Sequence, residues 1–179
     1  HPQMPWDSTE LCRVDLMDGL SPADVEVLAG GADESICQPK FSPDGSIYFV
    51  SDRTNWWNLY KYSHGAIERV VMIDAEMAYP AWVFGTNFYE FIDQDTIACL
   101  VNEKGRYWLG TIAGGEISKI LTDYDSFGPA IAYDRGFISC IASNAAMAPA
   151  VVQGSVADQQ VEMLHSSSTL MIDAAYLCL

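Results

Sequence analysis

The sequence has little positive charge. Nine Lys and Arg residues stand against 24 Asp and Glu residues, so the net charge at pH 7 is −15. Nucleic acids and anionic membranes are bound through cationic side chains that neutralise phosphate groups. We therefore expect neither nucleic acid nor a membrane among the partners.

The sequence also lacks the pattern of a metal site or a disulfide scaffold. None of the five cysteines belongs to a Cys-x-x-Cys motif, and an odd number of widely spaced cysteines is not typical of either framework. The acid pairs Asp93/Asp95 and Asp123/Asp125 lack the longer series of oxygen ligands of a calcium loop, so we interpret them as solvated turn residues. We predict no metal and no cofactor.

Long apolar stretches are absent as well. The longest one, at residues 137–152, contains Ser139, Ser143, Asn144 and Pro149, and it is too short for a membrane-spanning helix. No charged segment followed by an apolar stretch opens the chain, and a targeting signal further upstream would lie outside this sequence. We expect a cytoplasmic protein. The chain begins with His1 rather than Met, and we expect that this is not the natural start.

What the sequence does contain is a dense series of short apolar runs. Half of the residues are hydrophobic and 12% are aromatic, which is typical of a folded chain. The runs are rich in Val, Ile, Tyr, Phe and Trp and are separated by Gly, Asp, Asn and Pro, a pattern that predicts β-strands. The predicted strands are residues 10–16, 46–51, 58–62, 67–73, 79–84, 96–101, 107–112, 117–121, 136–142, 150–154 and 160–164.

Residues 20–28 give conflicting signals. Ser21, Pro22 and Asp24 resemble the start of a helix. The alternation of Val25, Val27 and Ala29 favours a strand. We predict the strand because it fits the repeat described next.

A repeated pattern of an Asp, five residues and a Pro occurs at residues 33–39, 74–80 and 123–129. Each Pro opens an apolar run, and three more predicted strands follow each run. Four strands in about 40 to 50 residues is the period of a β-propeller blade. We therefore predict an all-β fold, a partial β-propeller of about three and a half four-stranded antiparallel blades, with Pro39, Pro80 and Pro129 at equivalent positions.

The repeat also divides the chain. Residues 1–170 are predicted to form the incomplete propeller, in which residues 1–30 supply the last two strands of one blade. Three blades follow at residues 31–75, 76–124 and 125–168. Residues 171–179 are predicted to be an extended tail that leads toward a further domain.

Three segments resemble the propeller domain of prolyl oligopeptidase-family serine peptidases, in particular the branch of acylaminoacyl-peptidases and dipeptidyl-aminopeptidase-like enzymes. They are HPQMPWDSTEL at residues 1–11, QPKFSPDGSIYFVSDRTNWWNLY at 38–60 and YPAWVFG at 79–85. The Ser-Pro-Asp-Gly element is shared with TolB-like propellers, whereas the first segment is more specific. The resemblance is strong over residues 1–85 and weak over residues 127–179.

The resemblance implies a C-terminal α/β-hydrolase domain with a Ser, Asp, His triad and a propeller that restricts the access of peptides. This sequence contains no Gly-x-Ser-x-Gly motif, so the strained turn that presents the nucleophile is absent. No catalytic residue is assigned, and we expect the chain to be inactive alone. Its expected partners are the α/β-hydrolase domain of the same parent chain and a peptide substrate.

Five residues are candidates for contact with substrate or with the hydrolase domain: Trp6, Asp7, Arg53, Trp57 and Glu76. Trp57 and its neighbour Trp56 face opposite ways in a strand, so one can enter the core while the other reaches the surface. Glu76, like Glu34, lies in an Asp-x5-Pro segment, and some family members hold a substrate's amino terminus with propeller glutamates. Packing and solvation are the competing explanations for all of these residues.

The three histidines are weaker candidates. His64 and His165 have no nucleophile or orienting acid nearby in the sequence, so we expect both in surface loops. For His1 we favour a structural role beside Pro2 and Pro5. Scattered histidines also make a propeller hydrolase with its own central metal a poor interpretation.

The predicted strand order places the candidates on one side. In a blade with strands A to D, the loops between B and C emerge on the same side as the connections from D to the next A, because antiparallel strands reverse direction at each turn. This predicts that the loops 1–9, 53–57, 102–106 and 144–148 cluster with the connections 33–38, 74–79 and 123–128.

Two functions remain in competition. The first is a non-catalytic propeller fragment of a serine peptidase, which gates peptide access and docks on the hydrolase domain. The alternative is a fragment of a TolB-like binding propeller with no enzyme domain. Sequence that follows residue 179 in the parent gene distinguishes them.

Overall fold

The computed structural model describes residues 3–14, 25–158, 160–170 and 174–176. Within these residues the chain forms antiparallel sheets, no α-helix and a short 3-10 helix, η2 (Ala174–Tyr176). The strands are β1 (Glu10–Val14), β2 (Val25–Gly30), β3 (Ile36–Phe41), β4 (Ile47–Ser51), β5 (Asn58–Ser63), β6 (Ala66–Arg69), β7 (Tyr89–Phe91), β8 (Thr96–Glu103), β9 (Arg106–Ala113), β10 (Glu116–Lys119), β11 (Ser126–Asp134), β12 (Phe137–Asn144), β13 (Met147–Ser155) and β14 (Val161–Ser166).

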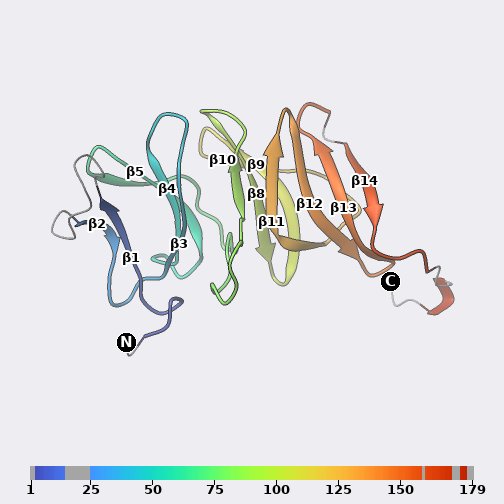
Figure 1. Ribbon diagram of the computed structural model, residues 1–179, viewed down its shortest axis with the longest axis horizontal. Helices are drawn as coiled ribbons and strands as arrows, with labels where there is room; N and C mark the ends of the chain where they lie inside the picture. The colour runs from blue at the N-terminus through green and yellow to red at the C-terminus, as the bar shows by residue number, and fades with distance from the viewer. Residues whose placement is uncertain (1–2, 15–24, 159, 171–173, 177–179) are drawn as a thin grey trace. The chain divides into compact units, whose positions relative to one another are not determined.

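These strands form one two-stranded sheet and three consecutive four-stranded sheets (Figure 1). Each four-stranded sheet keeps its strands in chain order, so β3 to β6, β7 to β10 and β11 to β14 are each a meander. The predicted all-β class and the partial propeller are confirmed. The strands belong to two compact units, His1–Phe84 and Gly85–Leu179, which are described separately below.

The first unit contains the sheet β1–β2 and the sheet β3–β6. Leu11, Leu28 and Ala29 from the two-stranded sheet pack with Phe49 and Tyr60 of the four-stranded sheet, and all five are at most 9% exposed. Every residue of β4 is buried. A strand covered on both faces carries an uninterrupted apolar run instead of an alternating one, which explains the sequence IYFVS of β4.

The Ser-Pro-Asp-Gly turn between β3 and β4 fixes the register of this sheet. The Asp44 carboxylate accepts hydrogen bonds from the Ser42 hydroxyl and from the Ser46 backbone N–H, and Lys61 approaches it to 3.1 Å. These bonds lower the pKa of Asp44, the Ser42 contact most strongly. Gly45 has φ of +81°, a conformation that L-residues with a side chain rarely adopt, so glycine is favoured there.

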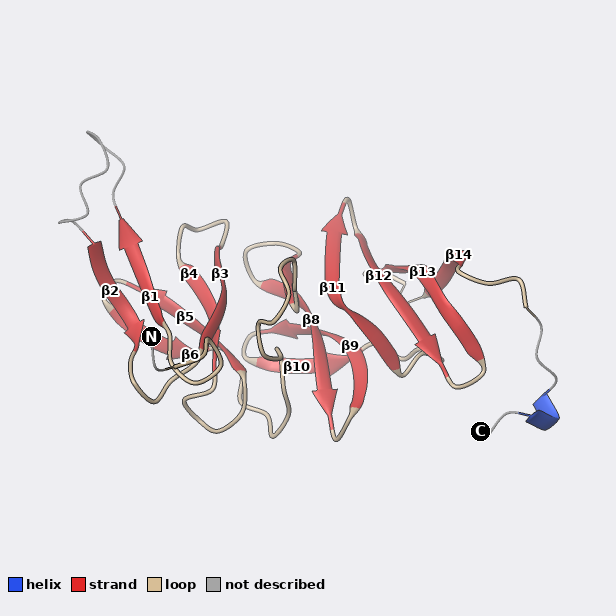
Figure 2. Ribbon diagram, turned by 60° about the horizontal axis from the view of Figure 1, so that its bottom comes forward, coloured by secondary structure: helices blue, strands red, loops and turns tan. Residues whose placement is uncertain are grey.

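The second unit contains the sheets β7–β10 and β11–β14, the latter drawn as adjacent strands in Figure 2. Its core includes Phe88, Tyr89, Leu100 and Val101, which are fully buried. Asn87 connects the two sheets: its backbone N–H donates to Pro129 O at 2.8 Å, and its carbonyl accepts from Ile131 N at 2.9 Å.

The predicted strand at residues 79–84 is wrong. The first strand of the β7–β10 sheet is β7, whereas residues 79–84 form an irregular segment in which Trp82 N donates to Pro80 O at 2.8 Å. Burial explains the difference, because Phe88 and Tyr89 are fully buried while Trp82 is 66% exposed. Pro80 is therefore not equivalent to Pro39 and Pro129, which lie within β3 and β11.

Other boundaries shift by a few residues. β6 and β10 end earlier than predicted, at Arg69 and Lys119, and β14 begins at Val161 and continues to Ser166. Residues 25–30 form the strand β2, as predicted. The predicted extended tail at residues 171–179 is wrong at Ala174–Tyr176, which form the 3-10 helix η2. The predictions for residues 15–16, 20–24, 171–173 and 177–179 lie outside the described residues. No helix in the described part is long and apolar enough to cross a membrane.

Candidate functional site

The loop that precedes the third strand of a four-stranded sheet meets the connection that enters the next sheet. The loop before β1 in the two-stranded sheet does the same. In the first unit, Thr9 N donates to Glu34 O at 2.9 Å, and Met77 N donates to Trp57 O at 2.7 Å. The Ser35 hydroxyl also donates to Pro5 O at 2.9 Å. The predicted clustering of loops and connections is confirmed in this unit.

The second unit repeats the arrangement. Tyr107 N donates to Asp125 O at 3.0 Å, and the Asn144 side chain donates to Asp123 O at 2.7 Å. Arg106 lies 3.7 Å from the Asp125 carboxylate, with both side chains largely exposed. We call the end of each sheet where these loops and connections meet the loop side.

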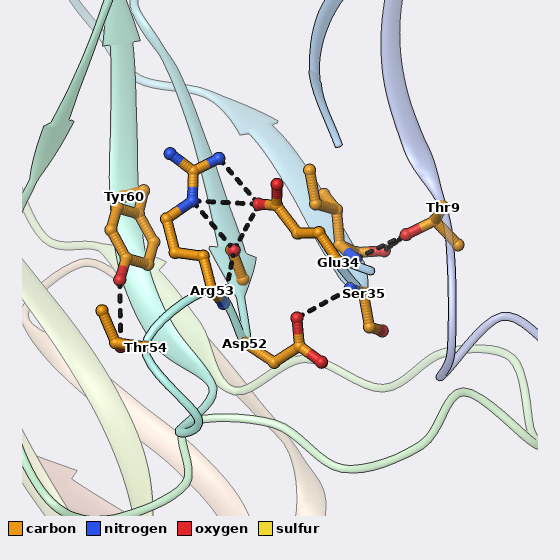
Figure 3. A network of polar contacts seen from close by, with 9 residues as sticks. Thr9, Glu34, Ser35, Asp52, Arg53, Thr54 and Tyr60 are labelled. Atoms are coloured by element: carbon orange, nitrogen blue, oxygen red, sulfur yellow. Dashed lines mark hydrogen bonds and ion pairs between the residues drawn. The ribbon is translucent and has the colours of Figure 1, made fainter. Parts of the chain in front are cut away.

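The most connected polar group on the loop side of the first unit is the pair of Arg53 and Glu34 (Figure 3). Arg53 Nη2 and Nε donate to Glu34 Oε1 at 2.7 and 2.9 Å, and the Ser51 hydroxyl donates to the same oxygen at 2.5 Å. The guanidinium also lies 4.9 Å from the Tyr60 ring centroid and 5.7 Å from that of Phe49. Charge, hydrogen bonds and aromatic rings together hold Arg53 in one place.

Asp52 and Thr9 fasten the segment that carries Glu34. The Asp52 carboxylate accepts a hydrogen bond from Ser35 N at 2.7 Å. The Thr9 hydroxyl both accepts from Ile36 N and donates to Ile36 O, at 2.5 and 3.0 Å. These contacts tie the loop before β1 to the start of β3 (Figure 3).

Trp57 and Glu76 form a second contact between a loop and a connection. Glu76 Oε2 accepts a hydrogen bond from Trp57 N at 2.8 Å. Burial raises the pKa of Glu76, the Trp57 hydrogen bond lowers it, and the nearby Asp52 raises it further, so that the pKa lies above its usual value. The Trp57 indole N–H is buried and has no hydrogen-bond partner in the described structure.

Replacing Glu76 with glutamine is expected to raise the melting temperature by about 2 °C at pH 7. When folding raises the pKa of a carboxyl group, the folded state is favoured while the group is protonated, at pH values below its usual pKa. That contribution to the free energy of unfolding is lost as the pH rises and the group ionises, so at pH 7 the charged Glu76 destabilises the fold. Glutamine still accepts from Trp57 N but places no charge beside Asp52.

Thermal melts at pH 7 and pH 4 test this expectation, with Glu68→Gln on the exposed part of β6 as the control. The difference in melting temperature between Glu76→Gln and the wild type should be smaller at pH 4 than at pH 7. A variant that is less stable than the wild type at pH 7 would contradict the pH dependence assigned to Glu76.

Trp6 contacts Trp82, a residue that the sequence pattern did not indicate as a candidate. Its ring centroid lies 4.9 Å from that of Trp82, and the two ring planes are tilted by 38°. Trp82 was missed because residues 79–84 resembled a buried strand. The Asp7 carboxylate accepts a hydrogen bond from the nearby Met4 N at 3.3 Å, and its contact with substrate or with the hydrolase domain stays a prediction.

The structure therefore gives four of the five candidates contacts on the loop side, in separate groups. Arg53 binds Glu34, and Trp57 binds Glu76. Asp52 accepts a hydrogen bond from Ser35 N in the Glu34 segment and acts electrostatically on Glu76. Trp6 is connected through its neighbour Pro5, which accepts from Ser35. The arrangement can present a mixed surface of carboxylates and aromatic rings, which suits contact with a peptide or another domain; these roles remain proposals.

The remaining polar candidates lie on the surface. His64 is exposed in the turn between β5 and β6, as predicted, and His1 lies outside the described residues. His165 is exposed as well, but the prediction of a loop is wrong, because His165 belongs to the strand β14. Asp93 accepts hydrogen bonds from Asp95 N and Thr96 N, both at 2.8 Å, as a turn-capping residue does. Among the described residues no group of three or more His, Cys, Asp and Glu side chains is placed to hold a metal ion.

Three cysteine thiols have strongly raised pKa values. Burial raises the pKa of Cys37, Cys99 and Cys140 to about 12 in each case. A thiol must lose its proton to act as a nucleophile, so these three are inert at neutral pH.

Comparison with known proteins gives matches at the level of structure. No family model and no curated protein matches the chain. A puromycin hydrolase mutant complexed with PGG matches 98% of this chain with a TM-score of 0.87 and 28% identity. A puromycin-hydrolyzing peptidase of Mycobacterium tuberculosis matches 99% with a TM-score of 0.89 and 25% identity. The chain spans 27% of the length of each of these two proteins.

Two more distant matches show the fold alone. TolB from Acinetobacter baumannii has a TM-score of 0.64 and 15% identity over 93% of this chain and 40% of its own. A prolyl endopeptidase has a TM-score of 0.68 and 8% identity over 90% of this chain and 23% of its own. The resemblance found in the sequence is confirmed: the chain is a partial β-propeller of the kind carried by peptidases of the prolyl oligopeptidase family.

Proposed function

We propose that this chain is the non-catalytic propeller segment of a prolyl oligopeptidase-family serine peptidase, and that its loop side gates peptides and docks on the α/β-hydrolase domain of the same parent chain. The observation that carries the proposal is the match of 98–99% of this chain to puromycin hydrolases at 25–28% identity. Most of each matched protein lies outside the matched segment, which leaves room for the hydrolase domain that the resemblance implies.

The loop side supplies the contacts that such a role needs. Arg53 is fixed by Glu34 and two aromatic rings, so it presents its free guanidinium N–H groups without a large loss of side-chain freedom on binding. Trp6 adds an aromatic ring on the loop side, where it packs against Trp82. Aromatic residues and Arg are the residue types that contribute most to binding at protein interfaces.

A TolB-like binding propeller is the second candidate function. The Ser-Pro-Asp-Gly turn and the TolB match are compatible with it, but that match has a lower TM-score and lower identity than the puromycin hydrolases. The peptidase assignment is therefore the one that we propose.

Alanine at Trp6 and at Arg53 in the full-length parent tests the role of the loop side. We expect each variant to change the ratio of kcat/KM between a long peptide and a short aminoacyl chromogenic substrate by about tenfold, the factor that corresponds to 1.4 kcal/mol of lost contact energy. A gate discriminates by size, so the short substrate should be affected least.

Arg135→Ala is the matched control, because Arg135 is 90% exposed at the opposite end of its sheet, in the turn between β11 and β12. Thermal melts of each variant separate a folding defect from an effect on gating. If Trp6→Ala and Arg53→Ala leave both peptide turnover and domain docking at wild-type levels, the proposed role of the loop side is wrong.

A further inference from the structure

Three consecutive apolar side chains are exposed on the irregular segment before β7. Trp82, Val83 and Phe84 are 66%, 55% and 107% exposed. The chain reverses around them through the bond from Trp82 N to Pro80 O and through Gly85, whose φ is +82°. We call residues 82–84 the aromatic turn. Contiguous exposed apolar side chains, unlike scattered single ones, mark sites of interaction with another molecule or domain.

The aromatic turn is anchored from two directions. Trp6 packs against Trp82 with a centroid distance of 4.9 Å. The connection that precedes the turn is held by Asn58, whose side chain bonds Ile73 and Ala75, and by Trp57, whose carbonyl accepts from Met77 N. An exposed aromatic group on an anchored segment loses little conformational freedom when it is buried by a partner.

The exposure of the aromatic turn indicates what kind of partner could cover it. Three successive side chains that are all more than half exposed form a continuous apolar surface rather than a single exposed group. An extended peptide substrate contacts one side of such a turn, whereas a concave protein surface can enclose it. The contact between Trp82 and Trp6 also places the turn on the loop side, which is the side proposed for docking.

We propose that the aromatic turn inserts into an apolar pocket of the α/β-hydrolase domain and anchors the propeller to it, with Phe84 as the central side chain. This inference rests on the proposed function and extends it, because it assigns domain docking to a segment separate from the Arg53 and Glu34 pair. Phe84 is the most exposed of the three side chains, so it has the most surface to bury in a partner.

Photo-crosslinking in the full-length parent tests the proposal. Phe84 is replaced by p-benzoylphenylalanine, the protein is irradiated, and the crosslinked peptides are identified by mass spectrometry. Phe41 is the matched control: it is also a phenylalanine, it is 70% exposed, and it lies at the end of β3 away from the loop side.

The expected result is a crosslink from position 84 to peptides of the hydrolase domain and none from position 41 to that domain. Crosslinks from position 84 to residues 85–179 of the same chain, to a second copy of the protein or to bound peptide alone would overturn the proposal.

A second variant, Phe84→Ser, measures the consequence. A fully exposed side chain contributes little to the stability of its own unit, so the unit should keep its fold. Hydrogen exchange of the hydrolase-domain peptides identified by crosslinking should become faster in Phe84→Ser and stay unchanged in Phe41→Ser. Unchanged exchange in both variants would contradict the anchor.

The two proposals fail in different ways. If Trp6→Ala and Arg53→Ala alter peptide selectivity while position 84 crosslinks elsewhere, the gating role stands and the anchor is wrong. A parent chain without a hydrolase domain would remove both.

Discussion

Replacing Asn58 with alanine is expected to lower the free energy of unfolding by about 3 kcal/mol. Asn58 is fully buried, and its amide group makes three hydrogen bonds. It donates to Ile73 O and Ala75 O at 3.1 and 3.2 Å, and it accepts from Ile73 N at 2.8 Å. Alanine leaves these backbone groups without partners in a region that excludes water, which costs more than the loss of an exposed hydrogen bond.

Chemical denaturation of this chain measures the effect, and hydrogen exchange at the Ile73 amide reports on the connection directly. Asn102→Ala is the matched control, because the Asn102 side chain caps a local exposed turn by accepting from Gly105 N at 2.9 Å. The control substitution should lower the free energy of unfolding by less than about 1 kcal/mol. Equal losses in the two variants would show that Asn58 does not hold the connection to the sheet.

The Asn58→Ala substitution should also affect the candidate site. Residues 73–77 carry Glu76 and lead into the aromatic turn, so release of this connection should also disturb the contact between Glu76 and Trp57. Asn58 itself belongs to a buried strand end and was not a candidate residue in the sequence. Its role follows from side-chain contacts between residues separated by 15 to 17 positions, which no local pattern encodes.

The fold could be predicted where local chemistry determines it. The turn at Ser42, Pro43, Asp44 and Gly45 specifies a tight reversal between two strands, and the uninterrupted apolar run of β4 indicates a strand covered on both faces. The repeated spacing of strands then indicated four-stranded sheets, and the three meanders confirm it.

Prediction failed at residues 79–84 because two patterns coincided there. The Asp-x5-Pro repeat correctly located the connection, since Glu76 meets Trp57 much as Glu34 lies beside Thr9. The chain, however, continues past Pro80 before β7 begins at Tyr89. An apolar run after a proline resembles a strand whether its side chains are buried or exposed, and only the packed structure distinguishes the two.

The candidate site was predictable as a region but not as a set of contacts. Strand order alone placed Arg53 near the connection that contains Glu34, because antiparallel strands bring those loops together. The choice of Glu34 as the partner of Arg53 depends on side-chain directions that sequence does not reveal. The contact of Trp6 with Trp82 could not be foreseen for the same reason.

Active-site labelling gives the second large expected effect and tests the central claim, that this propeller accompanies a catalytic domain and has no catalytic serine of its own. A serine becomes reactive toward fluorophosphonates only with a positioned base and oxyanion-stabilising donors. Residues 1–179 contain no Gly-x-Ser-x-Gly motif, and both His64 and His165 are exposed.

The measurement is stoichiometric labelling by a fluorophosphonate probe, read out by mass spectrometry, on this chain alone and on the full-length parent. We expect no labelled serine in the isolated chain, and one labelled serine in the parent that lies in a Gly-x-Ser-x-Gly motif outside residues 1–179. A stoichiometrically labelled serine within residues 1–179, or a parent with no reactive serine at all, would contradict the assignment.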